Sequence, residues 1–291
     1  MALTSPENFN SDYLREQVME TYDHVAREPH ADYHFHRGPK YASKYLGYDY
    51  SELISLPEIS TARFAGVGNP IDIGEIEPGM VVLDIASGIG SSAIFLAERF
   101  GCQVAGVDYS RASVAAANEA ASAAQVAHLV RFQQADAEEL PFFAGQFDAI
   151  ICECAFCTFP DKATAAAEFR RVLAPNGHIG ISDLTRQGDL PTELHTLLAW
   201  VACIADALPV DEYRTFLEDA GLHVSTVEFH PEALRQLIHD IRGKLVGAEL
   251  LVKLKQIDLP TTDFAQAKTI ARAAANSIES DDLTYTILIA G

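Results

Sequence analysis

The chain has 291 residues, of which 48% are hydrophobic and 21% charged, and its formal net charge is −20. This length and apolar content suffice for one α/β domain with an elaboration, or for two small domains. The acidic excess repels nucleic-acid backbones and anionic membrane surfaces, so we expect neither as a partner.

Cysteine usage and the absence of long apolar runs bear on location. No apolar run reaches the roughly 18 residues that a membrane span needs, and the chain does not open with a secretory leader. The five cysteines, an odd number, then indicate free thiols rather than a disulfide framework. We expect a cytoplasmic protein without a membrane partner. The sequence leaves open whether it is a monomer or a homodimer.

Residues 1–72 are expected to form a helical N-terminal lid or cap. Apolar residues recur at three- and four-residue spacing over 10–28, which predicts a helix. The stretch 40–72 has short helical patterns broken by glycines and prolines. Between them, Tyr33 and His36 lie in a segment rich in histidine and aromatic residues. This segment could cover a cofactor and bring both side chains near the reacting groups, or it could be an ordinary packed arm.

The same segment has the pattern of a metal site on paper. Asp32, His34 and His36 alternate, so an extended backbone would place them on one face. Most surface histidines bind nothing, however, and we expect no metal centre.

Residues 81–183 alternate between short apolar runs and helical patterns. This alternation predicts parallel βαβ units, which cross over in the right-handed sense. We expect strands at 81–85, 104–107, 130–134, 149–152 and 178–183, with helices at 91–100, 111–124 and 161–173.

A Gly-rich turn, ASGIG at 86–90, joins the first expected strand to its helix. Small residues in such a turn let the backbone and the helix N-terminus approach a ligand closely. About twenty residues later, Asp108 ends the second strand, where a carboxylate can accept both hydroxyls of a ribose. The turn therefore predicts a site for an adenosine-containing cofactor.

Both NAD and S-adenosylmethionine (SAM) carry such a ribose, and the turn distinguishes them. Ala86 stands where the dinucleotide fingerprint has its first glycine, and Asp84 comes just before the turn. A carboxylate would repel a pyrophosphate, whereas it would attract the ammonium and sulfonium groups of SAM. The charge pattern favours SAM as the cofactor.

The C-terminal third of the chain mixes helical and strand patterns. After Pro191 we expect a helix to about 207 and another over 210–220. Alternation predicts strands at 223–229 and 283–290, with helix-like runs at 231–246 and 262–278 between them. These patterns predict three parts, which are the N-terminal lid, a core made of 73–230 and 280–291, and a helical insertion, 231–279, that caps the strand ends.

Four segments in order resemble the cofactor motifs of class I SAM-dependent methyltransferases of the type 11, or ubiquinone-menaquinone methyltransferase-like, kind. They are LDIASGIG at 83–90, GVDYS at 106–110, FQQADAEELPF at 132–142 and FDAIIC at 147–152. The turn alone also occurs in dehydrogenases, but the four motifs together are specific. The resemblance implies an α/β fold with a Rossmann-like seven-stranded sheet, closed by an antiparallel pair of final strands and covered by helical N-terminal and C-terminal cap elements.

The resemblance also implies roles for the matched residues. Asp84 and the backbone of 86–90 would hold the methionine end of SAM, and Asp108 would hold the ribose. Tyr109 would pack on the adenine, unless it serves only as core packing. Asp136 and Ala137 would bind the adenine edge. The expected cofactor residues are Asp84, Ala86, Ser87, Gly88, Gly90, Asp108, Tyr109, Ser110, Asp136, Ala137 and Cys152.

Within this class, the chain resembles arsenite methyltransferases over about residues 45–225, in which three cysteine thiolates bind As(III). Cys154 matches the second of these cysteines and Cys203 the third. Val67 stands in place of the first, and Cys157 could supply a substitute. The resemblance implies that Cys154 and Cys203 hold As(III) or a related soft-element compound, whose lone pair attacks the methyl group.

A small organic acceptor is the alternative, because a valine in a ligand position indicates a change of substrate. Its nucleophile would lose a proton to a nearby base. Candidate bases are Tyr33, His34, His36, Glu153 and His195, the last being more typical of packing or solvent exposure. A non-catalytic SAM-binding protein is a third possibility, but the intact acidic and glycine residues favour an enzyme. The expected catalytic residues are Cys154, Cys203, Tyr33 and His36.

Overall fold

The computed structural model of the protein describes Met19, Asp23, Asn69, Ile204 and residues 38–56, 58–61, 76–195, 206–253 and 264–291. Most of the helix expected over 10–28 lies outside these residues, and so do Tyr33, His34, His36, Val67 and Cys203. No helix within the described ranges is long and apolar enough to cross a membrane.

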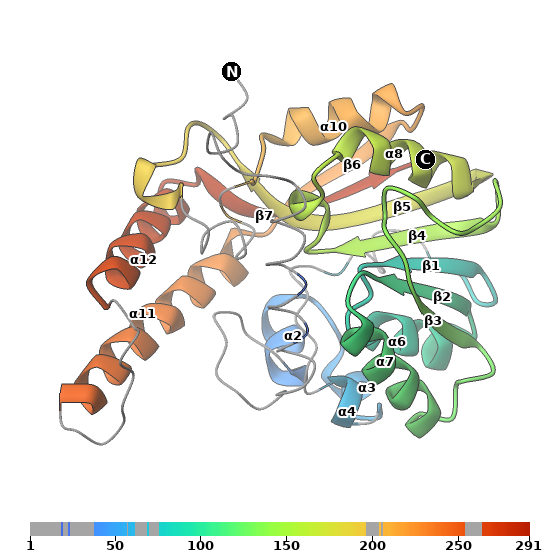
Figure 1. The fold of residues 1–291 in the computed structure, drawn as a ribbon, viewed down its shortest axis with the longest axis horizontal. Coiled ribbons are helices and arrows are strands. Elements are labelled where there is room, and N and C mark those ends of the chain that lie inside the picture. The colour runs from blue at the N-terminus through green and yellow to red at the C-terminus, as the bar shows by residue number, and fades with distance from the viewer. Residues whose placement is uncertain are drawn as a thin grey trace.

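Seven strands of the described chain form one sheet in the order β3-β2-β1-β4-β5-β7-β6 (Figure 1). Strands β1 to β5 pair in parallel, whereas β7 runs antiparallel to both of its neighbours. This is the seven-stranded α/β sheet with a final antiparallel pair that the sequence predicts. The strands are β1 (Val81–Ile85), β2 (Gln103–Asp108), β3 (Val130–Gln134), β4 (Phe147–Glu153), β5 (Leu173–Arg186), β6 (Val224–Phe229) and β7 (Leu283–Ala290).

Helices cover both faces of the sheet, with α8 and α10 on one face and α6 and α7 on the other (Figure 1). Side chains of β1 alternate between the two apolar clusters, since Val82 belongs to one and Leu83 and Ile85 to the other. Burial on both faces explains why the parallel strands are nearly continuous apolar runs. The helices are α2 (Pro39–Tyr45), α3 (Tyr50–Leu53), α4 (Glu58–Thr61), α6 (Ser91–Phe100), α7 (Arg111–Ala123), α8 (Lys162–Val172), α10 (Val210–Asp219), α11 (Pro231–Lys253) and α12 (Phe264–Glu279).

Some expected bounds differ from the structure. Strand β5 covers 173–186 rather than 178–183, because Leu173 already pairs with Phe147 and the far end pairs with β7 as far as Arg186. Local patterns do not record these long-range pairings. Helix α11 continues to 253 rather than 246. The helix expected from 191 to 207 lies mostly outside the described residues, within which 192–194 form the 3-10 turn η2 (Thr192–Leu194).

Helices α11 and α12 lie between β6 and β7 in sequence and pack on each other and on β7. Buried residues of both helices share one apolar cluster with α2 and α6. The parallel strands point towards the side of the molecule where α2, α11 and α12 lie (Figure 1). The division into a lid, a core and an insertion stays a prediction.

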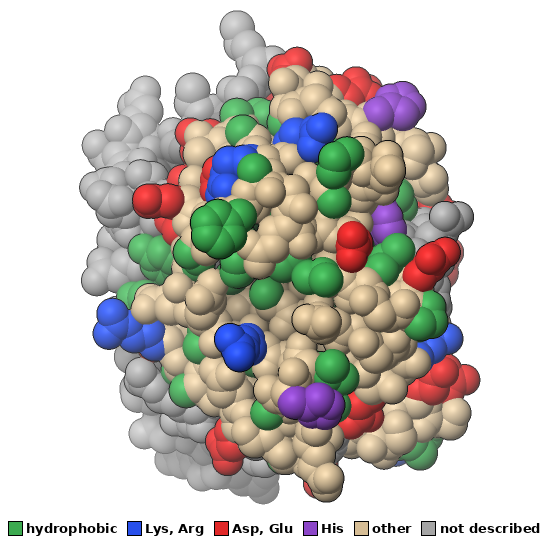
Figure 2. Space-filling model, turned by 90° about the vertical axis from the view of Figure 1, so that its right-hand side faces the viewer, with side chains coloured by type: hydrophobic (Ala, Val, Ile, Leu, Met, Phe, Trp, Pro, Cys, Tyr) green, Lys and Arg blue, Asp and Glu red, His purple; other side chains and the backbone are tan. Residues whose placement is uncertain are grey.

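The surface has little concentrated positive charge on the face shown in Figure 2. Lysine and arginine side chains are scattered there among acidic, apolar and neutral groups. Because phosphate backbones are bound by clustered cations, this face offers a nucleic acid no basic surface.

A substitution at Gly106 of β2 tests how closely side chains pack beneath the Gly-rich turn. A methyl group there would overlap the ring of Phe132 and lie 2.9 Å from Ser87 Oγ. We expect Gly106→Ala to lower the free energy of unfolding by about 1–3 kcal/mol, measured by urea denaturation. Gly243→Ala is the control, because nothing lies within 4 Å of its new methyl group in α11. That variant should gain up to about 1 kcal/mol from helix propensity. Equal effects of the two substitutions would contradict this packing.

Candidate active site

The turn between β1 and α6 has a left-handed backbone at three of its five residues, a conformation that glycine adopts freely and that is unfavourable for Ala86. The φ angles are 56° at Ala86, 53° at Gly88 and 82° at Gly90. The turn is closed by a 2.8 Å hydrogen bond from Gly90 N–H to Ser87 O, and a side chain at Gly90 would collide with Phe132. A methyl group at Gly88 would meet nothing within 4 Å. The turn is thus tight on its inner side and leaves open space beside Gly88.

Asp84, the fourth residue of β1, comes just before this turn, and it is 3% exposed. Its pKa is raised well above its ordinary value by burial and by the charges of Glu153 and Asp108, against one backbone N–H from Ala93. Its Oδ2 atom and the hydroxyl of Ser87 have no hydrogen-bond partner within the described part of the chain. Buried polar atoms are rarely left without partners, so these atoms fit a ligand that donates hydrogen bonds and carries positive charge.

Asp108 holds the turn and the start of α7 together. Its Oδ2 accepts the Gly88 N–H and its Oδ1 the Ser110 N–H, both at 2.8 Å. Burial nevertheless raises its pKa from 3.8 to about 6, with a smaller contribution from Asp23. The free folded protein therefore binds more protons than the unfolded chain between these two pKa values. Its stability falls as the pH rises through that interval.

The expected adenine and ribose residues lie around this carboxylate. Tyr109 is 43% exposed, which leaves its ring accessible. The Ser110 side chain is used within the protein, since its hydroxyl accepts the Ser113 N–H at the start of α7 and donates to Asp23. Asp136 follows β3 and accepts the Glu138 N–H at 2.9 Å, beside the buried Ala137. Contact of these residues with a cofactor stays a prediction.

Cys152 is fully buried near the end of β4. Burial raises the pKa of its thiol well above the ordinary value, and the charges of Asp183 and Asp84 raise it further. The side chain is therefore a neutral thiol, suited to packing beneath a ligand.

Glu153 is the last residue of β4 and Cys154 follows it, and together they form the corner next to the turn. Ser92 Oγ donates to Glu153 Oε1 at 2.5 Å, and the Tyr48 hydroxyl lies 3.4 Å from Oε1 and 3.5 Å from Oε2. Burial raises the pKa of Glu153 from 4.5 to about 7. Cys154 has a left-handed φ of 53°, and its N–H donates to Ser182 O at 2.7 Å. Non-glycine residues in this conformation are uncommon and cluster at functional sites.

Helix α2 and the residues that follow it cover this corner. Tyr41 of α2 is buried, and the pKa of its hydroxyl is raised by burial and then by the charge of Cys154. Tyr48 packs edge-on against Phe95 of α6, with ring centroids 5.6 Å apart. The N-terminal part of the chain therefore supplies tyrosines to the carboxyl end of β4.

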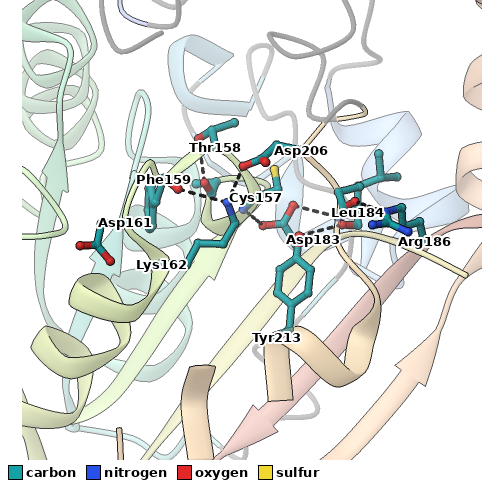
Figure 3. Close-up of polar contacts among 12 residues, drawn as sticks. Cys157, Thr158, Phe159, Asp161, Lys162, Asp183, Leu184, Arg186, Asp206 and Tyr213 are labelled. Carbon is teal, nitrogen blue, oxygen red and sulfur yellow. Dashed lines mark hydrogen bonds and ion pairs between the residues drawn. The ribbon is translucent and has the colours of Figure 1, made fainter. Parts of the chain in front are cut away.

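Cys157 is engaged within the core. Its N–H donates to Asp183 Oδ2 at 2.8 Å, and its thiol also bonds to that carboxylate (Figure 3). It is fully buried in the apolar cluster on the side of α8 and α10. To act as a substitute for the missing first thiolate, Cys157 would have to give up this bond, so that role stays a prediction.

The structure describes some of the other residues that the sequence suggests for the site, and the rest lie outside the described ranges. His195 is exposed at the end of η2, as expected for a solvent-facing residue. Within the described ranges, no three metal-ligating side chains come together. Cys203, Tyr33, His34 and His36 lie outside those ranges, and their roles stay predictions. Sequence reasoning missed Ser92 and Tyr48, because no local pattern pairs them with Glu153.

A family model for a methyltransferase domain matches residues 76–221, which include β1 to β5, α6, the turn and the Glu153 corner. The matched residues make up half of the chain. The chain belongs to the methyltransferase domain family. The sequence prediction of a SAM-dependent methyltransferase fold is confirmed at this level.

Curated relatives within this family act on varied compounds. Arsenite methyltransferase of Halobacterium salinarum is 29% identical over 193 residues, which are 65% of this chain and 48% of that protein. Tocopherol O-methyltransferase of Arabidopsis thaliana is 38% identical over 117 residues, which are 40% of this chain and 33% of that protein. The matched part thus spans half or less of these relatives' length.

A solved structure shows the same fold over nearly the whole chain. It is geranyl diphosphate C-methyltransferase from Streptomyces coelicolor, in complex with Mg²⁺, geranyl diphosphate and S-adenosyl-L-homocysteine. Its TM-score is 0.65 at 17% identity, and the match covers 95% of this chain and 97% of that one. At this identity the similarity establishes the fold, and the acceptor has to be argued from this chain's own residues.

Asp108 provides a test of the cofactor site. If its carboxylate accepts ribose hydroxyls, as the sequence predicts, Asp108→Asn should weaken SAM binding by about 10- to 100-fold, or roughly 1.5–3 kcal/mol, in calorimetry near neutral pH. Glu119→Gln, an exposed residue of α7, removes the same charge and should leave the affinity unchanged. Equal affinities of both variants would contradict the assignment of Asp108.

Affinity for SAM should also depend on pH. The free-protein pKa of Asp108 is about 6, and a bound cation favours the ionised form. We therefore expect the affinity to fall by up to about tenfold for each pH unit below about pH 6. Calorimetry across this interval measures the slope, and an affinity that rises on acidification would contradict this electrostatic picture.

Proposed function

We propose that the protein transfers the methyl group of SAM to a small-molecule acceptor bound at the corner formed by Tyr48, Glu153 and Cys154. The observation that carries the proposal is the buried Asp84 carboxylate, whose Oδ2 has no partner among the described residues, directly beneath the turn of a methyltransferase domain. A cationic cofactor would compensate that buried charge.

The residues around the turn fit SAM. Asp84 and the backbone of the turn would hold its methionine end, and Asp108 its ribose. When bound, SAM supplies an electrophilic methyl group on a positively charged sulfur. The chain's contribution is then to hold the acceptor in line with that methyl group and to exclude water.

The acceptor corner contains hydroxyl, carboxylate and thiol groups. Tyr48 and Glu153 favour a small organic molecule that can form hydrogen bonds, which we take as the leading acceptor class. The apolar contacts of Tyr48 with Phe95 provide a dry wall beside them.

As(III) is the second candidate acceptor, favoured by Cys154 and by the arsenite methyltransferase relative. Two thiolates, from Cys154 and Cys203, would hold it. Asp206, three positions after Cys203 in the sequence, is bonded at 2.5 Å to Lys162, the first residue of α8 (Figure 3). The engagement of Cys157 with Asp183 leaves this candidate without a third thiolate among the described cysteines.

We also propose a cytoplasmic location. The cysteines of the described ranges are free thiols, which suits a reducing compartment. A homodimer is a separate expectation that sedimentation can test.

Mass spectrometry with SAM and separate panels of phenols, amines, carboxylates and As(III) with a thiol reductant tests the function. We expect a methylated product from the organic panel. If As(III) is the acceptor, Cys154→Ser should abolish its methylation, because a hydroxyl is a poor ligand for a soft element. Cys102→Ser, distant from the corner, is the control. SAM binding without any methylated product would contradict the proposed activity.

A further inference from the structure

Glu153 lies on a different strand from Asp84 and Asp108, the two acidic residues near the ends of β1 and β2. Asp84 lies beneath the turn and Asp108 binds the turn backbone, so both serve the cofactor side. Glu153 is one strand further along the sheet, at the end of β4, and its neighbour Cys154 leads into the loop beyond the strand. With Tyr48 and Cys154 it forms the corner at which the proposed function puts the acceptor.

Hydrogen bonds fix one oxygen of this carboxylate and leave the other weakly held. Ser92 donates to Oε1 at 2.5 Å from the first turn of α6. The Tyr48 hydroxyl lies 3.5 Å from Oε2, which makes a long hydrogen bond. A carboxylate oxygen has two lone pairs, so Oε2 can accept a hydrogen bond from a bound molecule.

Burial favours the uptake of a proton by Glu153, whereas its hydrogen-bond donors oppose it. Tyr48 and Ser92 are neutral groups that donate to the carboxylate and lower its pKa, and Asp84 on β1 is an acidic neighbour. On its own strand Glu153 follows the buried Cys152 and precedes Cys154, and Tyr41 of α2 adjoins Cys154. Ser182 is its partner on β5. The effect of burial is the larger one and raises the pKa of Glu153 to about 7, where a carboxylate is an effective base.

We propose that Glu153 accepts the proton of the methyl acceptor, and that the acceptor is therefore a molecule whose nucleophilic oxygen, nitrogen or sulfur carries a hydrogen. This inference rests on the proposed function. It adds the chemical class of the substrate and a catalytic residue that the sequence placed only among several candidate bases.

The step balances as follows. The acceptor heteroatom forms a bond to the methyl carbon, the carbon–sulfur bond breaks with its electron pair remaining on sulfur, and the acceptor proton moves to Glu153 Oε2. The Ser92 hydroxyl holds Oε1 and so orients Oε2, the oxygen that accepts the proton. Glu153 then releases the proton to solvent when the methylated product leaves. An acceptor such as As(III), which attacks through a lone pair, requires no such base.

Four probes separate the acceptor classes, each with SAM and the full chain. Phenol and benzylamine present a hydroxyl or an amine that loses a proton on methylation, whereas benzoate and arsenite attack without losing one. Methylated product is measured by mass spectrometry for the wild type, Glu153→Gln and Glu98→Gln. The last is a control, because Glu98 is an exposed carboxylate on α6.

We expect phenol or benzylamine to be methylated, with kcat about 100-fold lower or more in Glu153→Gln and unchanged in Glu98→Gln. The KM for SAM should stay within a few-fold. The acid limb of the wild-type pH–kcat profile should vanish in Glu153→Gln. Ser92→Ala should reduce kcat less than Glu153→Gln and keep the limb.

Other outcomes overturn the inference. Equal kcat of wild type and Glu153→Gln with phenol or benzylamine would exclude Glu153 as the base and leave the proposed function intact. Methylation of benzoate or arsenite alone would exclude the proton-bearing substrate class. SAM binding with no methylated probe would overturn the proposed function, and the inference with it.

Discussion

Three carboxylates are brought together at the carboxyl ends of neighbouring parallel strands, and this clustering of negative charge dominates the site. Asp84 is the residue before the last of β1, Asp108 ends β2 and Glu153 ends β4. Burial raises the pKa of each, and the charges of Glu153 and Asp108 add to the shift at Asp84. Like charges held in a poorly solvated place are costly unless an opposite charge arrives. The fold thus holds buried carboxylates close together, and a cationic cofactor would compensate their negative charge.

The sheet can hold these carboxylates because it is anchored on both faces. Apolar residues of β1 divide between two clusters, and helices cover each side. On the side of α8 and α10, the buried Asp183 carboxylate accepts N–H groups from Cys157 and Leu184, while the Tyr213 hydroxyl donates to Leu184 O (Figure 3). Because every member of such a network is bonded, it fixes the strand ends next to Glu153 and Cys154.

Much of the core was predictable because its signals are local. The strand at 81–85, the helix that follows it and the acidic residue at 108 are separated by spacings that a βαβ unit imposes. Ala86 was expected to replace a glycine, and its left-handed φ of 56° shows why glycine is the usual residue there.

What the sequence could not supply were contacts between distant segments. Tyr48 lies 105 positions from Glu153, and Ser92 lies 61 positions from it, so no periodicity connects them. The same limit explains why β5 is longer than expected, because its extra length comes from pairing with β7. Nor could the position of Cys157 in the sequence, close to Cys154, reveal that its thiol bonds to Asp183 in the core.

The most direct test of the account is calorimetry of SAM binding in two buffers with different ionisation enthalpies, near about pH 6.5, between the pKa values of about 6 for Asp108 and about 7 for Glu153. If the strand-end carboxylates hold protons that a cation displaces, the measured heats must differ between buffers in the sense of net proton release. S-adenosylhomocysteine, which lacks the sulfonium charge, should release fewer protons. Identical heats for SAM in both buffers, or no binding at all, would contradict the central claim that the buried carboxylates form a site for a cationic cofactor.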